Sequence, residues 1–136
     1  MENYDKMFDY TDYLCYILYL MTQNKIDYLS DDYWEKLANQ SLVRFFILRA
    51  LKDKDLHGYL LIKGIRELSR DFCSPSESTL YPALNQFLKA GLIVQANPSS
   101  KDKKTYRITP KGKEAFKVAA KTWNRILPTL NRRTIL

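Results

Sequence analysis

The sequence is poor in the residues that build catalytic and metal centres. Its 136 residues include one histidine, two cysteines and four glycines. Cys15 and Cys73 are far apart and belong to no C-x-x-C pair, so the spacing of a zinc site is missing. No glycine falls in a G-x-G-x-x-G loop, and no Ser-His-Asp order or carboxylate pair stands out. We therefore expect no enzyme, no metal and no cofactor, and we expect both thiols to be reduced and buried.

Long hydrophobic stretches are also missing. The most apolar run, residues 13–21, is much shorter than the roughly 18–20 residues that a membrane-spanning helix needs. The N-terminus is acidic, whereas a secretory signal begins with basic residues. The chain has no internal repeat and no low-complexity linker. The sequence therefore predicts a cytoplasmic protein without a membrane partner, and its length suits one domain.

The charge is distributed unevenly along the chain. The formal net charge is +7 and the isoelectric point is near 9.4. Residues 1–40 carry eight acidic and three basic residues, a net charge of −5, whereas residues 41–136 have a net charge of +12. Seven of the ten tyrosines lie before residue 34. This predicts an acidic, tyrosine-rich helical extension over residues 1–32 and a basic domain over residues 33–136. The basic charge suits an acidic partner such as nucleic acid, or simply a solvated surface.

The spacing of apolar residues predicts a run of helices. Apolar side chains recur with the 3.6-residue period over residues 4–24, 33–52, 57–69 and 76–90. Ser30 is placed to cap the second helix, with carboxylates in its first turn, and Gly91 suits the C′ position of the fourth. His57 stands at the start of the third helix, where we expect it to cap or pack rather than to bind a ligand.

After the fourth helix the pattern changes to that of a β-hairpin. Residues 92–96 and 105–108 are rich in β-branched and aromatic side chains, which is typical of short strands. They are joined by turn residues at 97–100 and a lysine-rich tip. The order predicts a mainly α fold with a small two-stranded β-wing. This is a winged helix-turn-helix with an extra N-terminal helix and a long C-terminal helix.

The C-terminal helix is expected to mediate dimerisation. It begins at Thr109-Pro110, with proline at the favoured N1 position, and runs to about residue 130, where Pro128 kinks or shortens it. Its apolar stripe and that of residues 34–51 carry more apolar surface than one small winged helix needs. We therefore predict a homodimer with two-fold symmetry, in which the helix over about 110–130 contributes to the seam.

The helix over residues 76–90 has two different faces. Apolar side chains that point to the core fall within about 60° of Leu84, namely Leu80, Phe87 and Leu88. Glu77 turns away from the opposite face, which is polar and free of carboxylates. That face consists of Ser78, Thr79, Pro82, Gln86 and Lys89, with Tyr81 at its border. Such a surface fits the DNA major groove, where hydroxyls bind phosphates and amides or lysines read base edges, although a solvated helix face is the simpler alternative.

The lysine-rich hairpin tip favours the DNA-binding interpretation. Exposed cations there can reach a phosphate backbone or a minor groove, although a charged turn is often merely solvated. Found together with the polar helix face and the basic domain, the lysines predict a surface for double-stranded DNA. Its expected members are Ser76, Ser78, Thr79, Tyr81, Pro82, Gln86, Lys89, Lys101, Lys103 and Lys104.

Four short motifs resemble the PadR family of transcriptional regulators. They read LHGY at residues 56–59, SESTLYPAL at 76–84, LKAGLI at 88–93 and YRITPKG at 106–112. The resemblance covers about residues 43–122. It implies a winged-helix homodimer that represses genes by binding palindromic operators, with the helix of the TLYPAL motif as the recognition helix.

Ligands and alternative functions stay open at this point. Some family members bind aromatic effectors between subunits, and Trp123 could line such a site, although core or dimer packing is the commoner role of a tryptophan. Judged from its residues, the chain could instead be a winged-helix protein-interaction module that binds protein through its acidic segment and hairpin. It could also be a plasmid or viral segregation or replication protein that coats DNA.

Overall fold

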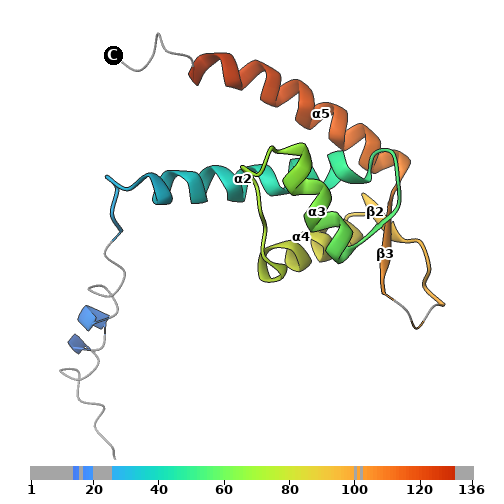
Figure 1. Ribbon diagram of the computed structural model, residues 1–136, viewed down its shortest axis with the longest axis horizontal. Coiled ribbons are helices and arrows are strands. Elements are labelled where there is room, and N and C mark those ends of the chain that lie inside the picture. Colours follow the sequence, from blue (N-terminus) through green and yellow to red (C-terminus); the bar gives the residue numbers. More distant parts are fainter. Residues whose placement is uncertain (1–13, 16, 20–25, 100, 102, 131–136) are drawn as a thin grey trace, which may run out of the picture. The chain divides into compact units, whose positions relative to one another are not determined.

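Helices and a small antiparallel sheet make up the fold (Figure 1). The computed structural model describes residues 14–15, 17–19, 26–99, 101 and 103–130. In chain order the elements are α2 (Asp31–Leu51), β1 (Leu56–His57), α3 (Gly58–Leu68), α4 (Glu77–Lys89), β2 (Ile93–Gln95), β3 (Thr105–Ile108), α5 (Pro110–Ile126) and the 3-10 helix η1 (Leu127–Leu130). Most of the helix predicted over residues 4–24 lies outside the described residues, and the described part of it is helical.

The chain divides into two units, Met1–Glu35 and Lys36–Leu136. The described part of the first unit has an aromatic cluster. The ring of Tyr33 packs edge-on against Tyr28 and Trp34, with centroid distances of 5.0 and 5.1 Å. The indole Nε1 of Trp34 donates a hydrogen bond of 2.9 Å to the backbone oxygen of Tyr28. These contacts link the start of α2 to the residues that precede it.

The start of α2 agrees with the sequence prediction. The helix begins directly after Ser30, and its first turn carries Asp31 and Asp32, whose negative charges suit the positive end of a helix. Only its C-terminal part is buried, from Val43 onward. α2 therefore contributes to the core with its second half.

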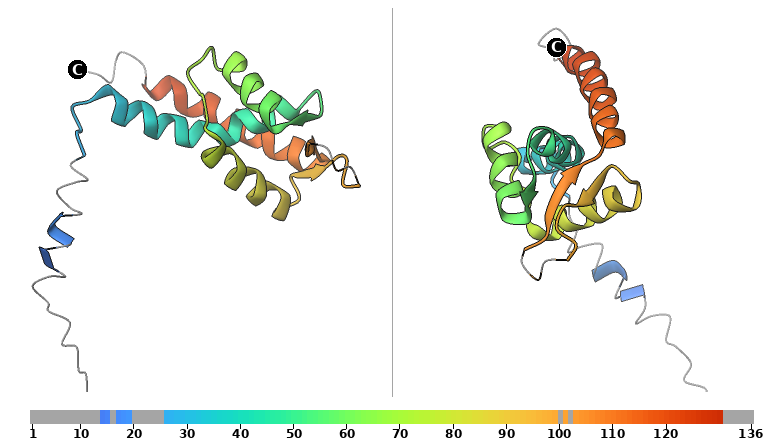
Figure 2. Two further views of the ribbon diagram at one scale, coloured as in Figure 1. Left: turned by 60° about the horizontal axis from the view of Figure 1, so that its bottom comes forward. Right: turned by 90° about the vertical axis from the view of Figure 1, so that its right-hand side faces the viewer.

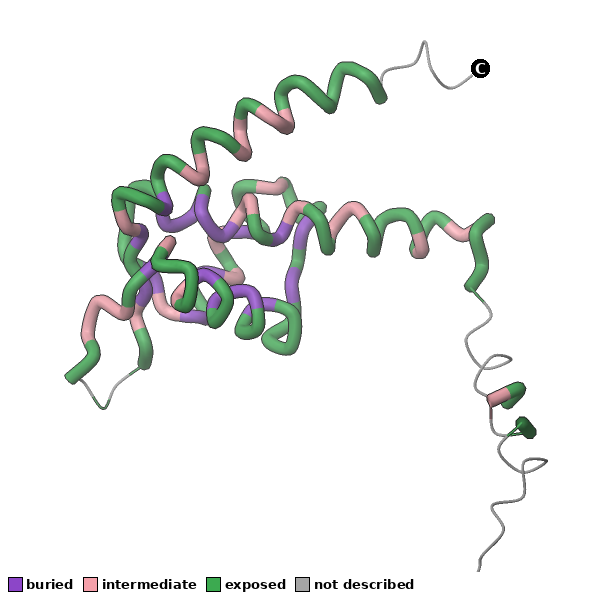
Figure 3. The backbone as a smooth tube through the Cα atoms, turned by 180° about the vertical axis from the view of Figure 1, so that it is seen from behind, coloured by how far each residue is buried: buried purple, intermediate pink, exposed green. Residues whose placement is uncertain are grey.

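The core of the second unit lies between α2, α3, α4 and the sheet. In Figure 2, α2 runs through the middle with α3 and α5 on either side. Burial of one large apolar side chain stabilises a fold by about 1.5–3 kcal/mol, so the buried apolar side chains of this core make a large contribution to stability. The largest fully buried side chains, within the purple stretches of Figure 3, are Ile47, Leu51, Leu61, Ile65, Cys73, Leu80, Leu84 and Ile93.

The sheet has three strands in the order β1-β3-β2. β2 and β3 are the two strands of the predicted wing, and β1 is an additional strand that was not predicted. β1 pairs with β3 through Leu56 opposite Tyr106, and β2 pairs with β3 through Ile93 opposite Ile108. The prediction missed β1 because two residues are too few to show the alternation of a strand. His57 was expected to cap or pack at the start of α3. It occupies the N-cap position of α3 and is half-buried, as the last residue of β1, but its side chain makes no capping bond to the helix.

Asn97 closes the hairpin between β2 and β3. Its side-chain oxygen accepts a 2.9 Å hydrogen bond from the backbone N–H of Thr105, and its side-chain nitrogen donates to the backbone oxygen of Lys103 at 3.1 Å. The backbone N–H of Ala96 also donates to Thr105, at 2.7 Å. These bonds fix the backbone of Lys103 and Lys104 at the point where the wing loop enters β3.

The turn between α3 and α4 is held by a Schellman arrangement. The N–H of Asp71 donates to the carbonyl of Arg66 at 2.7 Å, and the N–H of Arg70 donates to the carbonyl of Glu67 at 3.2 Å. Arg70 and Asp71 have positive φ angles of 53° and 63°, a region that favours glycine. The side chains of Arg66 and Asp71 form an exposed ion pair of 3.0 Å across the same turn.

Gly91 ends α4 in the predicted way. Its φ angle is +72°, which places it in the left-handed region expected at a C′ position. The N–H of Leu92 donates to the carbonyl of Phe87 at 2.9 Å, and that of Gly91 donates to Leu88 at 3.1 Å. The chain then turns directly into β2.

The first turn of α5 is bonded to the end of α4. Thr109 caps α5 as predicted, since its hydroxyl accepts from the N–H of Gly112 at 3.0 Å, and Pro110 follows at the helix start. The same hydroxyl lies 2.7 Å from the carbonyl oxygen of Gly91. The Nζ of Lys111 donates to the carbonyl of Ala90 at 2.7 Å. A β-carbon at Gly112 would collide with a carbonyl oxygen of the chain leaving α4, so this close approach requires glycine.

Most of α5 is exposed beyond its first turn (Figure 3). Gly112 is its one buried residue. On the inner side, the ring of Phe116 packs against Phe45 of α2 with a centroid distance of 5.4 Å. The α-helix ends at Ile126 and continues as η1, which contains Pro128. The predicted shortening near this proline is therefore seen as a change of helix type.

Candidate nucleic-acid interface

The core face of α4 is confirmed. The buried residues of α4 are Leu80, Ala83, Leu84 and Phe87, and Leu88 is half-buried. The predicted outer residues are all exposed: Ser78, Thr79, Tyr81, Pro82, Gln86 and Lys89. Pro82 lies inside the helix and has no N–H, so the carbonyl of Ser78 loses its usual partner four residues on. Because Ser78 is exposed, that carbonyl can be solvated instead.

Three hydroxyls meet at the start of α4. The Oγ of Ser76 lies 2.8 Å from the Oγ of Ser78 and 3.1 Å from the Oγ1 of Thr79. Ser76 occupies the N-cap position, yet its side chain makes no capping bond to the first turn. The hydroxyls are all exposed at the positive end of the helix dipole, where an anion is favoured.

A pocket of about 300 Å³ lies between the start of α3, the start of α4 and the wing. It is lined by His57, Gly58, Tyr59, Glu77, Tyr81, Lys103, Lys104 and Tyr106. The LHGY and TLYPAL motifs, which are distant in the sequence, therefore contribute to one surface. A β-carbon at Gly58 would lie 2.5 Å from the phenol oxygen of Tyr81, so only glycine leaves room for this ring.

The pocket brings together residues that the sequence analysis had not combined. Tyr59 is 70% exposed and was not among the predicted site residues. Glu77, the first residue of α4, was expected to turn away from the polar face of the helix. It is exposed and lines the pocket together with Lys103. Burial raises the pKa of Tyr106, and the neighbouring Tyr81 raises it further, so the Tyr106 phenol stays protonated at neutral pH.

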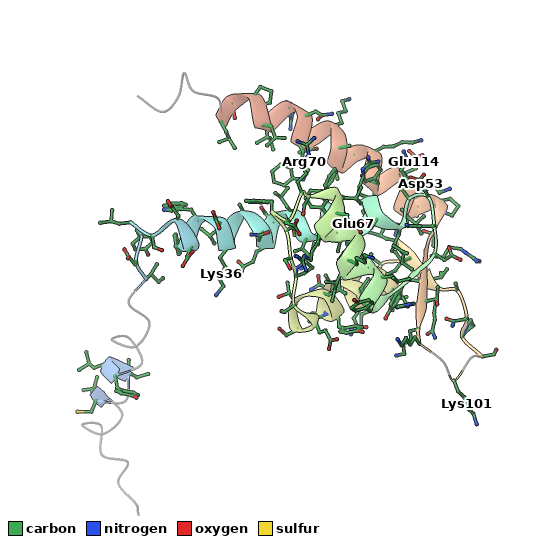
Figure 4. All side chains as sticks on the ribbon, in the orientation of Figure 1. Lys36, Asp53, Glu67, Arg70, Lys101 and Glu114 are labelled. Atoms are coloured by element: carbon green, nitrogen blue, oxygen red, sulfur yellow. The ribbon has the colours of Figure 1, made fainter. Side chains whose placement is uncertain are left out.

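The wing lysines lie where the sequence predicted an exposed tip. Lys101, Lys103 and Lys104 are exposed, and Lys101 extends away from the helices at the end of the wing (Figure 4). The other basic side chain on this hairpin, Arg107, is neutralised. Its guanidinium binds the carboxylate of Asp55 at 2.6–3.1 Å, and this contact holds the pKa of Asp55 below its ordinary value.

Gln86 is held by a residue of another helix. The Nη2 of Arg44, on α2, donates a 2.8 Å hydrogen bond to the Oε1 of Gln86. Both side chains are exposed. The sequence analysis did not include Arg44, because the two residues are 42 positions apart and no local pattern relates them.

The two cysteines differ in environment. Cys73 is fully buried, as predicted, and burial raises the pKa of its thiol, so it stays in the unreactive thiol form. The prediction was wrong for Cys15, which is exposed. Its described neighbours Leu14 and Leu18 are each 57% exposed, so this stretch forms no core around the thiol.

Within the described residues, no three histidine, cysteine or acidic side chains gather in a way that could hold a metal ion. None of the described helices combines the length and the apolar character that crossing a membrane requires. Trp123 is half-buried on α5, and the same helix exposes Val118. The pocket at the start of α4 and the wing beside it bring lysine, phenol and helix N-terminal groups together on one surface.

Comparisons with known proteins agree with this geometry. The model of the transcriptional regulator PadR-like family matches residues 47–118. The transcriptional regulator Rv3488 of Mycobacterium tuberculosis is 36% identical over 79 residues, which cover 57% of this chain and 71% of that protein. A transcriptional regulator from Clostridium thermocellum superposes with a TM-score of 0.63 at 29% identity, over 70% of this chain and 95% of that one. A PadR family transcription regulator from Clostridium difficile R20291 superposes with a TM-score of 0.56 at 28% identity, over 68% and 98% of the two chains.

Proposed function

The chain belongs to the PadR-like family of transcriptional regulators, and on this premise we propose that it is a repressor that binds a palindromic operator as a homodimer. DNA binding and regulation of transcription come with the family. We assign the contacts with DNA to α4, to the pocket at its start and to the wing. The chain acts by binding rather than by catalysis, and it works in the cytoplasm.

One observation carries the assignment of the DNA surface. The pocket joins exposed lysines of the wing to the exposed start of α4, and it also holds the phenols of Tyr59 and Tyr81. A phosphate needs donors and positive charge, and this surface offers lysine ammonium groups, phenol hydroxyls and a helix N-terminus together. Glu77 is the one carboxylate among the residues that line this pocket, and its charge offsets part of the attraction of Lys103 and Lys104 for a phosphate.

The proposed contacts divide into two classes. In the major groove we place the outer face of α4, whose short side chains allow close approach to the bases. On the adjacent backbone we place the wing, whose lysines neutralise phosphates without reading sequence. The groove contacts are Ser76, Ser78, Thr79, Tyr81, Pro82, Gln86 and Lys89, and the backbone contacts are Lys101, Lys103 and Lys104.

The dimer is proposed to form through α5. The helix exposes Val118 by 66%, and η1, which continues it, exposes Leu130 by 65%. A two-fold dimer would cover such side chains and set two copies of α4 about one turn of DNA apart, roughly 34–36 Å. We propose that residues 1–32 form an acidic extension and residues 33–136 the DNA-binding domain. A small aromatic effector near Trp123 is a subordinate part of the proposal.

Footprinting on the DNA upstream of the protein's own gene tests the function. A repressor should protect one site with two related half-sites and bind scrambled DNA about 10³-fold or more weakly. Protection that spreads along the duplex would favour a protein that coats DNA. Failure to shift any duplex at low salt would favour a protein-interaction module and would overturn the proposal.

A further inference from the structure

We propose that Arg44 sets the base preference of α4 by holding the amide of Gln86, so that Gln86 offers hydrogen-bond donors to the groove. The inference rests on the proposed function in one respect, namely that the outer face of α4 enters the major groove. Arg44 itself is a positioning residue in this proposal and need not touch a base. The expected result is a preference for guanine at the base pair that Gln86 meets.

The geometry fixes which end of the Gln86 amide faces Arg44. A guanidinium has donors and no acceptor, so the 2.8 Å contact from Nη2 of Arg44 requires the amide oxygen. The usual ambiguity between the oxygen and nitrogen of a glutamine is therefore resolved by the chemistry of its partner. The nitrogen, with its two N–H donors, is the end left for another molecule.

The consequence for base recognition follows from the pattern of the major groove. A free glutamine reads adenine with both ends of its amide, since the oxygen accepts from N6 and the nitrogen donates to N7. Arg44 occupies one of the two lone pairs of this oxygen and turns it toward α2, which weakens its hydrogen bond to adenine N6. Two N–H donors match guanine, which presents the adjacent acceptors N7 and O6. Arg44 therefore converts Gln86 from a reader of adenine to a reader of guanine.

Both side chains are exposed, so the hydrogen bond between them is not needed for folding. Neither Arg44 nor Gln86 belongs to the core, so replacing either one should leave the fold intact. An exposed hydrogen bond of this kind contributes little to stability. The effect of this hydrogen bond on which end of the Gln86 amide faces the groove can therefore be measured separately from its effect on stability.

The test measures base preference at every operator position for four proteins. Each operator base pair is replaced by the three others, and binding is titrated for the wild type and for Arg44→Ala, Arg44→Lys and Arg49→Ala. Arg49→Ala removes the same charge from the same helix and is the matched control. Thermal melts verify that each variant is folded.

Wild type should prefer guanine over adenine at one position by about tenfold, and Arg44→Ala should reduce or invert that ratio. Arg44→Lys keeps a donor and should retain the guanine preference, at least in part, whereas Arg49→Ala should leave it unchanged. If Arg44→Ala weakened all sequences equally and lowered the salt dependence, Arg44 would be a phosphate contact and the inference would be wrong. If the wild type bound no sequence preferentially, the proposed function would fail as well, so the two failures are distinguishable.

Discussion

The phenol of Tyr81 on α4 lies directly over Gly58 at the start of α3, so that a β-carbon on residue 58 would come within 2.5 Å of the phenol oxygen. The contact joins two of the four motifs that carry the family resemblance, LHGY and SESTLYPAL. It also makes the position of Tyr81 depend on a residue that has no side chain. This dependence leads to a test that separates DNA binding from stability.

Gly58→Ala should displace the Tyr81 ring and weaken DNA binding roughly three- to tenfold, the effect of losing about one hydrogen-bonded contact. The fold should survive, because the obstructing atom is the far end of a side chain that can move. Gly64→Ala is the control, since its β-carbon would meet neighbours at an ordinary 3.8 Å. It should raise the free energy of unfolding by about 0.5–1 kcal/mol and leave DNA binding unchanged. Equal DNA affinity in both variants would exclude Tyr81 from the interface.

Replacing Lys101, Lys103 and Lys104 with alanine should weaken binding to operator and scrambled DNA alike, because phosphate contacts carry no sequence information. If each lysine neutralises one phosphate, the log–log salt slope should fall by about 0.9 for every lysine in each subunit. Titrations between 50 and 200 mM salt, the range in which such slopes are usually measured, provide the readout. A slope equal to that of the wild type would remove the wing from the contacts.

Leu84→Ala and Ser78→Ala should have opposite effects. Leu84 is fully buried, so its truncation should lower the free energy of unfolding by about 2–5 kcal/mol. It should depress binding to every sequence through the unfolded fraction. Ser78 is exposed, so its truncation should change stability by no more than about 0.5 kcal/mol while reducing operator preference. Thermal melts paired with titrations decide the matter, and a destabilised Ser78→Ala would contradict the assignment.

The contact between Asp55 and Arg107 predicts a pH dependence of stability. The pKa of Asp55 is lowered from its ordinary value of 3.8, chiefly by hydrogen bonding to Arg107. Its stabilising effect is therefore present above about pH 3.8 and is lost as the pH falls through the lower folded-state value. Asp55→Asn should melt below the wild type at neutral pH, and the gap should narrow below pH 3.8.

That effect should be modest, because the two side chains are 35% and 57% exposed and solvent screens the pair. Asp53→Asn, in the same loop, removes a carboxylate that makes no described ion pair and serves as the control. Melting temperatures measured from pH 2 to pH 7 provide the comparison. A gap between Asp55→Asn and the wild type that stayed constant over this whole range would contradict the prediction.

Val118→Lys should convert the proposed dimer to a monomer that still folds. Val118 is 66% exposed on α5, so a charge there costs the single chain little but would be buried without a partner in an apolar seam. Light scattering at micromolar concentration measures the assembly. Lys121→Glu changes an exposed charged position of the same helix and should keep the dimer. A wild type that is already monomeric would refute the proposed assembly.

Local patterns in the sequence predicted the parts of the fold that depend on neighbours in the chain. The 3.6-residue period identified the buried face of α4 around Leu84, because each apolar residue there packs on the same core. Gly91 and Thr109 were predicted at their helix ends, because capping depends on a few adjacent backbone groups. Both signals are contained within about four residues, which is the range that a sequence pattern reports.

Contacts across the fold could not be predicted in the same way. Arg44 binds Gln86 over 42 positions, and Arg107 binds Asp55 over 52 positions. Charged residues are common on any surface, so the sequence does not say which of them will meet. Both contacts change the candidate site: one orients an amide on α4, and the other removes a free cation from the wing. The exposure of the three wing lysines was easier to predict, because a charged turn at the end of a hairpin has no core to pack against.

The junction between α4 and α5 makes the two helices a mechanical unit. The hydroxyl of Thr109 reaches the carbonyl of Gly91, and the ammonium group of Lys111 reaches that of Ala90, both at 2.7 Å. The absence of a side chain at Gly112 lets the backbones touch at the same place. The first turn of α5 is therefore bonded to the residues that end α4, while the rest of α5 is largely exposed. A small rotation of the exposed part of α5 would therefore move α4, the helix that we propose to contact DNA.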